Sequence, residues 1–285
     1  MLILCKLHIY KKFKLMNIDL HTHTNASDGK LTPAELLQRA EDRGIDLLSI
    51  TDHDTVAAYS KIQSSPLTLI PGIEFSTCWH SAGIHIVGLN IDLKSDVIRV
   101  AITYQTTARH RRAEEIAAKL ERNGIKDAFT GAQQIAGNDN IGRPHFAEYL
   151  VQAGACVSVE EAFKKFLGSG KAGDIRKFWA AMPQIIDWIR AAGGIAVLAH
   201  PLTYRMTRMK LSLLLDDFIA AGGQAIEVVS GKQMPHDTRN LANICSQKNL
   251  LASCGSDFHQ PGASRAELGQ FPPLPNDCNP VWENF

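Results

Sequence analysis

Short apolar segments alternate with segments of helical periodicity along most of the chain. The apolar segments with the length and composition of buried strands are Asn17–Leu20, Asp46–Ile50, Leu67–Ile70, Ile84–Leu89, Ile195–Ala199, Ala225–Val229 and Leu250–Cys254. Strands that alternate with helices are typical of repeated βα units. The pattern therefore predicts an α/β fold with a mainly parallel sheet.

The first predicted helix carries signals at both ends. Thr32 is a suitable N-cap, Pro33 occupies the first helical position, and Glu35 stands three residues after the cap, where a capping box needs it. Gly44 directly follows Arg43 and supplies the stop. The local sequence thus predicts a helix that ends at Arg43.

The segment from about residue 92 to 177 does not follow the βα rhythm. It contains a long helical pattern over Asp96–Asn123, which Gly124 ends, and another over Ser158–Leu167, with Ser158 as a plausible cap. We interpret residues 92–177 as a helical insertion between two strands of the body, positioned to cover the mouth of a site.

The remaining chain divides around this insertion. Residues 16–91 and 178–269 are expected to form the body. Residues 1–15 mix aliphatic residues with lysines and lack a signal-peptide cleavage site, so we expect an N-terminal extension that is disordered or results from an upstream start codon. Residues 270–285 are rich in Pro and Asn and are expected to form a tail without regular structure.

Composition limits the possible partners. The chain has 285 residues, of which 45 % are hydrophobic and 21 % charged, as in ordinary globular proteins. Because its formal net charge is +1, local charge must hold any anionic substrate, and long DNA is not an expected partner.

Six cysteines without a CxxC pair favour reduced thiols in a cytoplasmic protein. No apolar run is long enough to span a bilayer, so no membrane partner is expected.

Metal-ligand side chains gather at the C-terminal ends of separate apolar segments. His21 and His23 are two residues apart, so on a strand both imidazoles point to the same side, and Asp19 is placed to orient one of them. Asp257 and His259 repeat this spacing after the last segment. Because the C-terminal ends of parallel barrel strands share one face, these residues are expected to meet in one pocket.

Other acids and histidines extend the same pattern. Asp28 lies in a Ser-Asp-Gly loop, His53 directly follows the second segment, and Glu74 follows a Pro-Gly-Ile sequence at an expected strand end. His85 lies within a predicted strand and His200 ends another. Nitrogen and oxygen ligands favour Mn²⁺, Zn²⁺, Fe²⁺ or Mg²⁺. So many ligands exceed the needs of one ion, and Glu74 could bridge two.

Five motifs resemble, in order, those of the PHP (polymerase and histidinol phosphatase) family. They are Asp19-Leu20-His21-Thr22-His23, Thr51-Asp52-His53-Asp54, Pro71-Gly72-Ile73-Glu74, Ala199-His200-Pro201 and Gly255-Ser256-Asp257-Phe258-His259. The resemblance runs from about Met16 to Gly269. It implies a distorted seven-stranded (β/α) barrel and a phosphoesterase site with two or three divalent ions, for which we expect Mn²⁺.

The resemblance also implies three ligand sets. They are His21, His23, Glu74 and Asp257 for the first ion, Glu74, His85 and His200 for the second, and Asp28, His53 and His259 for the third. His80 is an alternative to His85, although Trp79-His80-Ser81 has the pattern of a hairpin tip. Catalytic roles are expected of Glu74, His53, Asp257 and His259, but metal ligation competes with proton transfer by these side chains.

Basic residues of the insertion resemble the branch of the family that acts on 3′,5′-nucleotide bisphosphates or, as 5′-to-3′ exoribonucleases, on short 5′-phosphorylated RNA. The residues are Arg109, Arg112, Arg143 and His145. A phosphate away from the metals needs its own cationic clamp, and guanidinium groups suit phosphate. Arg205 and Asp28 are further candidates for substrate contact. The alternatives without a role in substrate binding are a solvated helix face for the arginines and a helix cap for His145.

The sequence thus predicts a metal-dependent phosphoesterase. A metal-activated hydroxide would hydrolyse nucleotide bisphosphates, 5′-phosphorylated short RNA, or both. One alternative is a phosphatase for a small metabolite such as histidinol phosphate, in which the arginines would be idle. A second is an amidohydrolase or deaminase, which typically adds a strand-borne lysine that bridges the metals. A third is a non-catalytic metal-binding module, against which the complete set of ligand residues argues.

Overall fold

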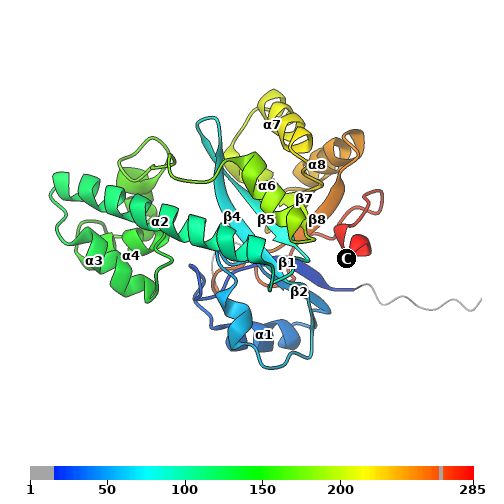
Figure 1. Cartoon of the computed structure of the whole chain (residues 1–285), viewed down its shortest axis with the longest axis horizontal. Helices are drawn as coiled ribbons and strands as arrows, with labels where there is room; N and C mark the ends of the chain where they lie inside the picture. Colours follow the sequence, from blue (N-terminus) through cyan, green and yellow to red (C-terminus); the bar gives the residue numbers. More distant parts are fainter. Residues whose placement is uncertain (1–15, 263–265) are drawn as a thin grey trace, which may run out of the picture.

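The computed structural model describes residues 16–262 and 266–285, and the expected N-terminal extension lies outside the described residues. The described strands form two sheets (Figure 1). One sheet contains β1 (Ile18–Thr22), β2 (Leu47–Ile50) and β3 (Thr68–Leu69). The other contains β4 (Gly72–Trp79), β5 (Ala82–Leu89), β6 (Ile195–Leu198), β7 (Ala225–Ser230) and β8 (Leu251–Gly255), in that order.

The predicted α/β class is confirmed, whereas the seven-stranded closed barrel is not. The three-stranded sheet is parallel, but β5 pairs antiparallel with both β4 and β6, and neither sheet closes on itself. The two sheets meet instead through single parallel bridges, Thr22 with Phe258 and His53 with Glu74. The antiparallel pairs arise because β4 and β5 form a hairpin, which needs only a tight turn.

The sequence signals for this hairpin and for the first helix were correct in detail. His80, at the expected hairpin tip, has a positive φ of 49° between β4 and β5. Helix α1 (Pro33–Asp42) begins with the predicted capping box, in which Thr32 and Glu35 satisfy each other's backbone amides. Arg43 caps the C-terminus, and Gly44 adopts φ 65°.

Helices on the outside of the sheets complete the main core. They are α6 (Met182–Ala191), α7 (Arg208–Ala220) and α8 (Pro235–Gln247) beside the larger sheet, and α1 beside the smaller one (Figure 1). The apolar faces of α6, α7 and α8 pack on β4–β8 in one continuous cluster of buried side chains. None of the described helices combines the length and the apolarity needed to cross a membrane.

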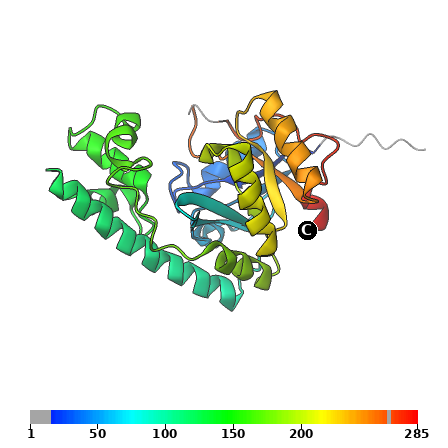
Figure 2. The ribbon, with the colours of Figure 1, turned by 90° about the horizontal axis from the view of Figure 1, so that it is seen from above.

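The expected helical insertion consists of α2 (Asp96–Arg122), α3 (Ala128–Ala136), α4 (Arg143–Gln152) and α5 (Val159–Ala162), followed by a π-helical turn over Phe163–Leu167. The C-terminal half of α2 packs with the shorter helices around a hydrophobic core of its own, which includes Leu120, Phe146 and Leu150. In Figure 2 this helical lobe stands beside the sheets, and the long α2 connects the two parts.

The C-terminal tail is more regular than expected. Pro280 forms an isolated bridge with Ala252 of β8, and Val281–Asn284 form a 3₁₀ turn. Val281 is fully buried. The tail thus packs on the outer edge of β8, because burying Val281 removes its apolar surface from water.

A buried ion pair joins the insertion to the sheets. Arg109 of α2 donates from Nε to Oδ2 of Asp54 at 2.7 Å and from Nη2 to Ser76 Oγ at 3.1 Å. The side chains of Arg109 and Asp54 are only 7 % and 0 % exposed. Gln105, one turn earlier, donates to Asp54 Oδ1 at 2.8 Å. Asp54 therefore connects α2 to β4 and to the loop that carries His53.

We expect Arg109→Met to destabilise the protein by about 3–5 kcal/mol, since it leaves the buried Asp54 carboxylate without its cation. Urea denaturation would measure the free energy of unfolding of the variant and of the wild-type protein. Arg111→Met is the matched control, because Arg111 is exposed on the same helix, and it should change stability by less than about 0.5 kcal/mol. Equal effects of the two substitutions would contradict this role for the ion pair.

Candidate metal centre

One buried carboxylate lies at the centre of the histidine and acid cluster. The Glu74 side chain is 0 % exposed and lies within 3.3 Å of five imidazoles. Its Oε1 is 2.8 Å from His85 Nδ1 and 2.9 Å from His200 Nε2. Glu74 is the third residue of β4, not a residue beyond a strand end as predicted. The antiparallel partner β5 brings His85 to the same pocket.

Backbone pairing explains how residues distant in sequence reach Glu74. The Asp54 amide donates to the Glu74 carbonyl at 2.9 Å, so the loop after β2 places His53 beside this carboxylate. On the opposite side, the Asp257 amide donates to the His21 carbonyl at 2.9 Å. A Cβ on Gly255 would lie 2.4 Å from His21 Cβ, so the close approach of β8 to β1 requires glycine there.

The structure brings all nine predicted metal ligands together. Potential ligand atoms approach within 4.8 Å of one another in four overlapping groups: His21, His23 and Asp257; His21, Glu74 and His200; His53, Glu74 and His85; and His23, Asp28, His53 and His259. The groups resemble the three predicted sets, but His21, His23 and His53 each belong to two groups. His80 is exposed at its hairpin tip, which leaves His85 as the residue in the cluster.

The arrangement of polar atoms fits bound cations. His21 Nε2 and His23 Nε2 face each other at 3.1 Å, and His85 Nδ1 and His200 Nε2 at 3.2 Å. Glu74 Oε2 is buried and lies near imidazole nitrogens, yet makes no hydrogen bond of acceptable geometry. Buried polar atoms are normally satisfied, and lone pairs that point into one space are satisfied by a cation between them.

The pKa values of several candidate ligands also suit the binding of cations. Burial lowers the pKa of His23 to about 3 and that of His85 to about 4, so both are neutral near pH 7. Burial opposes the charge of Glu74, but His53, His21 and His85 outweigh it and hold the Glu74 pKa well below its usual value. Asp28 has a lowered pKa because His259 and His53 likewise outweigh burial. Ionised carboxylates and neutral imidazoles are the forms that bind metals. Although burial opposes charge on His53, Glu74 and Asp28 raise its pKa, so a cation would replace a proton there.

Glu227 is a site residue that the sequence analysis missed. This β7 residue is 1 % exposed, and its Oε1 lies 2.5 Å from His21 Nδ1. Its Oε2 accepts from the His200 amide at 2.6 Å. Its position inside the otherwise apolar run Ala225–Val229 was the signal available in the sequence. Although burial opposes charge on His21, Glu227 and Glu74 raise the His21 pKa well above its usual value.

Asp19 does not have the role that its position suggested. It accepts hydrogen bonds from the backbone amides of Ser256 and Gly269, at 2.9 and 3.0 Å, so it ties β1 to the loops after β8. Burial raises its pKa to about 6. Glu227, not Asp19, is thus the carboxylate that fixes the tautomer and orientation of His21.

The basic residues expected to hold phosphate are only partly brought together. Arg109 and Arg112 flank the Trp179 ring, each with its guanidinium carbon 5.3 Å from the ring centroid. Burial, then Arg143 and Arg109, lower the pKa of Arg112, so these three guanidinium groups lie close enough to repel one another. Arg205, by contrast, is exposed at the end of a 3₁₀ turn over Pro201–Tyr204, and the described residues show no ion pair or hydrogen bond from its side chain to the cluster.

His145 caps α4, which is the structural alternative that the sequence offered for it. Its Nδ1 accepts from the Gly142 amide at 3.0 Å. Burial lowers its pKa, and nearby Asp28 opposes this shift. His145 therefore places the first turn of α4, which also carries Arg143, near the Asp28 end of the cluster.

The α/β fold and the cluster of candidate metal ligands at the junction of the two sheets are typical of metal-dependent hydrolases. The chain belongs to the PHP family, because the PHP domain model matches residues 19–191. It is 42 % identical to the 5′-3′ exoribonuclease Rnm of Escherichia coli, over 93 % of this chain and 92 % of that protein. It is 39 % identical to the 3′,5′-nucleoside bisphosphate phosphatase of Chromobacterium violaceum, over 95 % and 97 %.

A solved structure from Chromobacterium violaceum shares the fold. It is described as an amidohydrolase with bound sulfate and no metal, and it aligns with a TM-score of 0.86 at 38 % identity, covering 94 % of this chain and 95 % of that one. The expected PHP family is confirmed by the family model, the expected phosphoesterase class by the curated relatives, and this solved structure shows the shared fold.

We expect Mn²⁺ to raise the melting temperature of metal-free protein by about 5 °C or more, since a ligand at 100 times its dissociation constant adds about 2.7 kcal/mol. Glu74→Gln should lose most of this shift and most of the bound metal measured by elemental analysis. His80→Asn is the matched control and should retain both. A wild-type protein without any Mn²⁺-dependent shift would contradict the metal centre.

Glu227→Gln should weaken Mn²⁺ binding about 10- to 100-fold, because the amide no longer orients His21 as the carboxylate does. Titration calorimetry would measure the affinity. Asp19→Asn is the contrasting variant: it removes a buried carboxylate that bonds to backbone amides and to the Ser256 side chain, not to the His21 ring, so it should lower stability with a smaller effect on affinity. Unchanged affinity in Glu227→Gln would refute the orienting role.

Proposed function

We propose that this chain hydrolyses the ester bond between phosphorus and the 3′ oxygen of a nucleotide that carries a 5′-phosphate. The substrates would be 3′,5′-nucleotide bisphosphates and short 5′-phosphorylated RNA. The observation that carries this proposal is the pairing of two anion-binding centres: the Glu74 cluster, and a group of buried guanidinium groups in the insertion. The names of the two relatives cited above support the same pair of substrates.

The Glu74 cluster is the proposed site of the reaction. Divalent cations held there would supply Lewis acidity and lower the pKa of water to near neutrality, and we propose Mn²⁺ as the ion. Glu74 would bridge two ions, with His21, His23 and Asp257 on one side and His85 and His200 on the other. The Asp28, His53 and His259 group would hold a third ion or the leaving oxygen. His259 and His53 are 21 % and 13 % exposed, so a substrate can reach them.

The second centre would hold the phosphate that does not react. Arg112 donates from Nε to the Ile175 carbonyl at 2.8 Å, and Arg143 donates to the Leu167 carbonyl at 3.3 Å. Their remaining N–H groups can face a phosphate, and an anion there would offset both the burial and the repulsion by Arg143 and Arg109 that lower the Arg112 pKa. Arg109 is already bound to Asp54 and Ser76, so we assign it to positioning the insertion rather than to the clamp.

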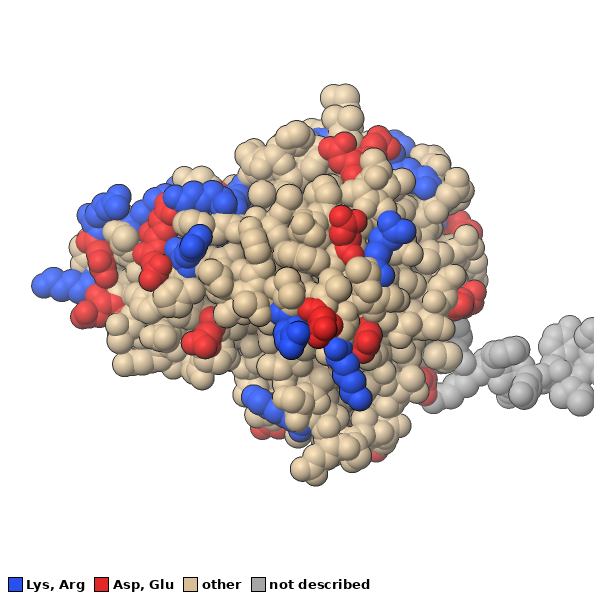
Figure 3. Space-filling view, viewed as in Figure 1, with Lys and Arg blue, Asp and Glu red and all other residues tan. Residues whose placement is uncertain are grey.

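Contacts between the insertion and the ligand-bearing loops favour a small substrate. Asn140 Nδ2 donates to the His53 carbonyl at 2.5 Å, and Lys30 pairs with Glu148 of α4 at 2.5 Å. The insertion would thus cover the Asp28 end of the cluster. On the face shown in Figure 3, basic and acidic side chains are interspersed over the insertion, which is not the pattern of a track for long polyanions.

Release of phosphate and nucleotide from adenosine 3′,5′-bisphosphate and from short 5′-phosphorylated RNA, with Mn²⁺ and with chelator, tests the proposal. We expect turnover of both substrates that chelator abolishes. Turnover only of small monoesters such as histidinol phosphate would support a metabolite phosphatase instead. No turnover of any phosphate ester by metal-loaded protein would support a non-catalytic module.

The clamp is tested by Arg112→Ala and Arg143→Ala. Each should lower kcat/KM for adenosine 3′,5′-bisphosphate by about 10- to 100-fold, since a hydrogen bond to a charged group contributes about 1.5–3 kcal/mol. Neither should much affect a small monoester with one phosphate. Arg111→Ala, at an exposed position beside Arg112, is the matched control and should leave both activities unchanged. Equal losses on both substrates would argue against a clamp.

A further inference from the structure

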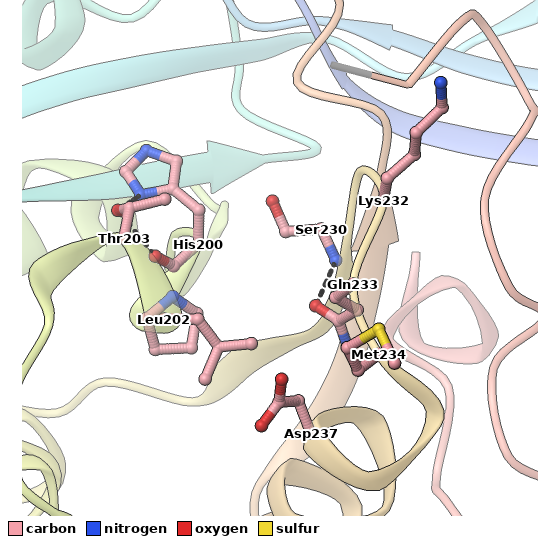
Figure 4. A pocket seen from close by; sticks show the side chains of 9 residues that line it. His200, Leu202, Thr203, Ser230, Lys232, Gln233, Met234 and Asp237 are labelled. Atoms are coloured by element: carbon pink, nitrogen blue, oxygen red, sulfur yellow. Dashed lines mark hydrogen bonds between the residues drawn. The ribbon is translucent and has the colours of Figure 1, made fainter. Parts of the chain in front are cut away.

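A pocket of about 330 Å³ lies beside the Glu74 cluster, between the turn after β6 and the turn after β7 (Figure 4). The residues that line it and enter the argument are His200, Leu202, Ser230, Lys232, Met234 and Asp237. Its volume is at the lower end of the range for pockets that hold small ligands. Of its lining residues, only His200 belongs to the proposed reaction site, and none belongs to the arginine clamp.

His200 separates this pocket from the cluster. Its Nε2 lies 2.9 Å from Glu74 Oε1, and its Nδ1 lies 2.9 Å from Thr203 Oγ1 on the pocket side. Its backbone is held in an uncommon conformation, φ 26°, while its amide donates to Glu227. A ligand in the pocket is therefore in contact with a residue that also borders the proposed site of phosphoryl transfer.

The pocket and the arginine clamp border different ends of the cluster. Arg143 and His145 approach the Asp28 end through α4, whereas the pocket borders the His200 end, on β6 and β7. Glu74 lies between these ends, since it contacts both His53 and His200. A substrate held by the clamp and by the cluster would extend toward the pocket only if it continued beyond its reacting phosphate.

The lining suits a nucleotide. Leu202 and Met234 lie on opposite sides of the pocket in Figure 4 and are 39 % and 59 % exposed. They offer an apolar surface to a base. The Ser230 hydroxyl and the Asp237 carboxylate point inward, where ribose hydroxyls can bond to them. Lys232 extends from the rim, with no ion pair among the described residues, and suits a phosphate.

The reaction itself explains why only one substrate would need this pocket. Water adds to phosphorus, the bond between phosphorus and the 3′ oxygen of the first nucleotide breaks, and that oxygen takes up a proton. With a bisphosphate, the phosphorus leaves as inorganic phosphate. With RNA, the same phosphorus still carries the second nucleotide through its 5′ oxygen, so the site must accommodate that nucleotide.

We propose that the pocket beside His200 binds the nucleotide on the 3′ side of the reacting phosphate, and that it makes the chain able to act on RNA as well as on bisphosphates. This inference rests on the proposed function. It assigns Lys232 and Met234 to RNA specificity, with no role in the hydrolysis of adenosine 3′,5′-bisphosphate.

The test compares the full-length K232A/M234A variant with wild type on two substrates, adenosine 3′,5′-bisphosphate and a 5′-phosphorylated diribonucleotide, both with Mn²⁺. We expect kcat/KM for the dinucleotide to fall at least about tenfold, mainly through KM, and the value for the bisphosphate to change less than about twofold. The matched control is M209A/K210A. These residues begin α7, are exposed, and lie outside the pocket.

Binding of a non-hydrolysable 5′-phosphorylated dinucleotide, measured by calorimetry, gives a second readout that does not depend on turnover. Weaker binding in K232A/M234A but not in M209A/K210A would support the inference. Equal losses on both substrates, or no loss on the dinucleotide, would overturn it. Wild-type protein that hydrolyses only the bisphosphate would overturn it too and leave the phosphatase function intact, whereas inactivity on both substrates would overturn the proposed function.

Discussion

The Glu74 carboxylate is the constraint around which the site is arranged. It is fully buried, and five imidazoles lie within 3.3 Å of it. A buried charge requires compensation, and histidines without a cation compensate it only if they bind protons. Burial holds the His23 and His85 imidazoles neutral, so compensation by protons falls to His21 and His53, whose pKa values the nearby carboxylates raise despite burial. Cations between the rings and the carboxylate would satisfy both kinds of group at once.

The same residue lies at the junction of the two sheets. The bridge between His53 and Glu74 joins the smaller sheet to the larger one, and the bridge between Thr22 and Phe258 joins them at the other edge. An irregular junction leaves backbone segments free to carry ligands from β1, from the loop after β2, and from the loop after β8. Glu74 and His85 reach the cluster from the regular hairpin of β4 and β5, so the cluster combines side chains from paired strands with side chains from loops at the junction.

The insertion adds charge that the sheets do not provide. Its connection to the site depends on Asp54, which binds Arg109 and Gln105 of α2 and lies next to His53. One acid thus places a helix relative to a ligand-bearing loop. Beyond this anchor, Arg112 and Arg143 lie on one side of the cluster and the pocket with Lys232 lies on the other. Basic side chains thus lie on both sides of the Glu74 cluster.

The sequence by itself determined the features that depend on local spacing. The capping box at Thr32, the limits of the long helix that begins at Asp96, and the candidate ligands that follow apolar segments all depend on residue type and periodicity. The family motifs added the ligand sets, and the structure brings those residues together.

Only the tertiary structure decided which distant groups meet. Glu227 and His21 are 206 positions apart, and no local pattern pairs them. The hairpin of β4 and β5 placed Glu74 inside a strand, and the partner of Arg109 proved to be Asp54 rather than solvent. A ligand type is a property of one residue, whereas its orientation, its hydrogen-bond partner and the closure of a sheet arise from packing between segments that the sequence keeps apart.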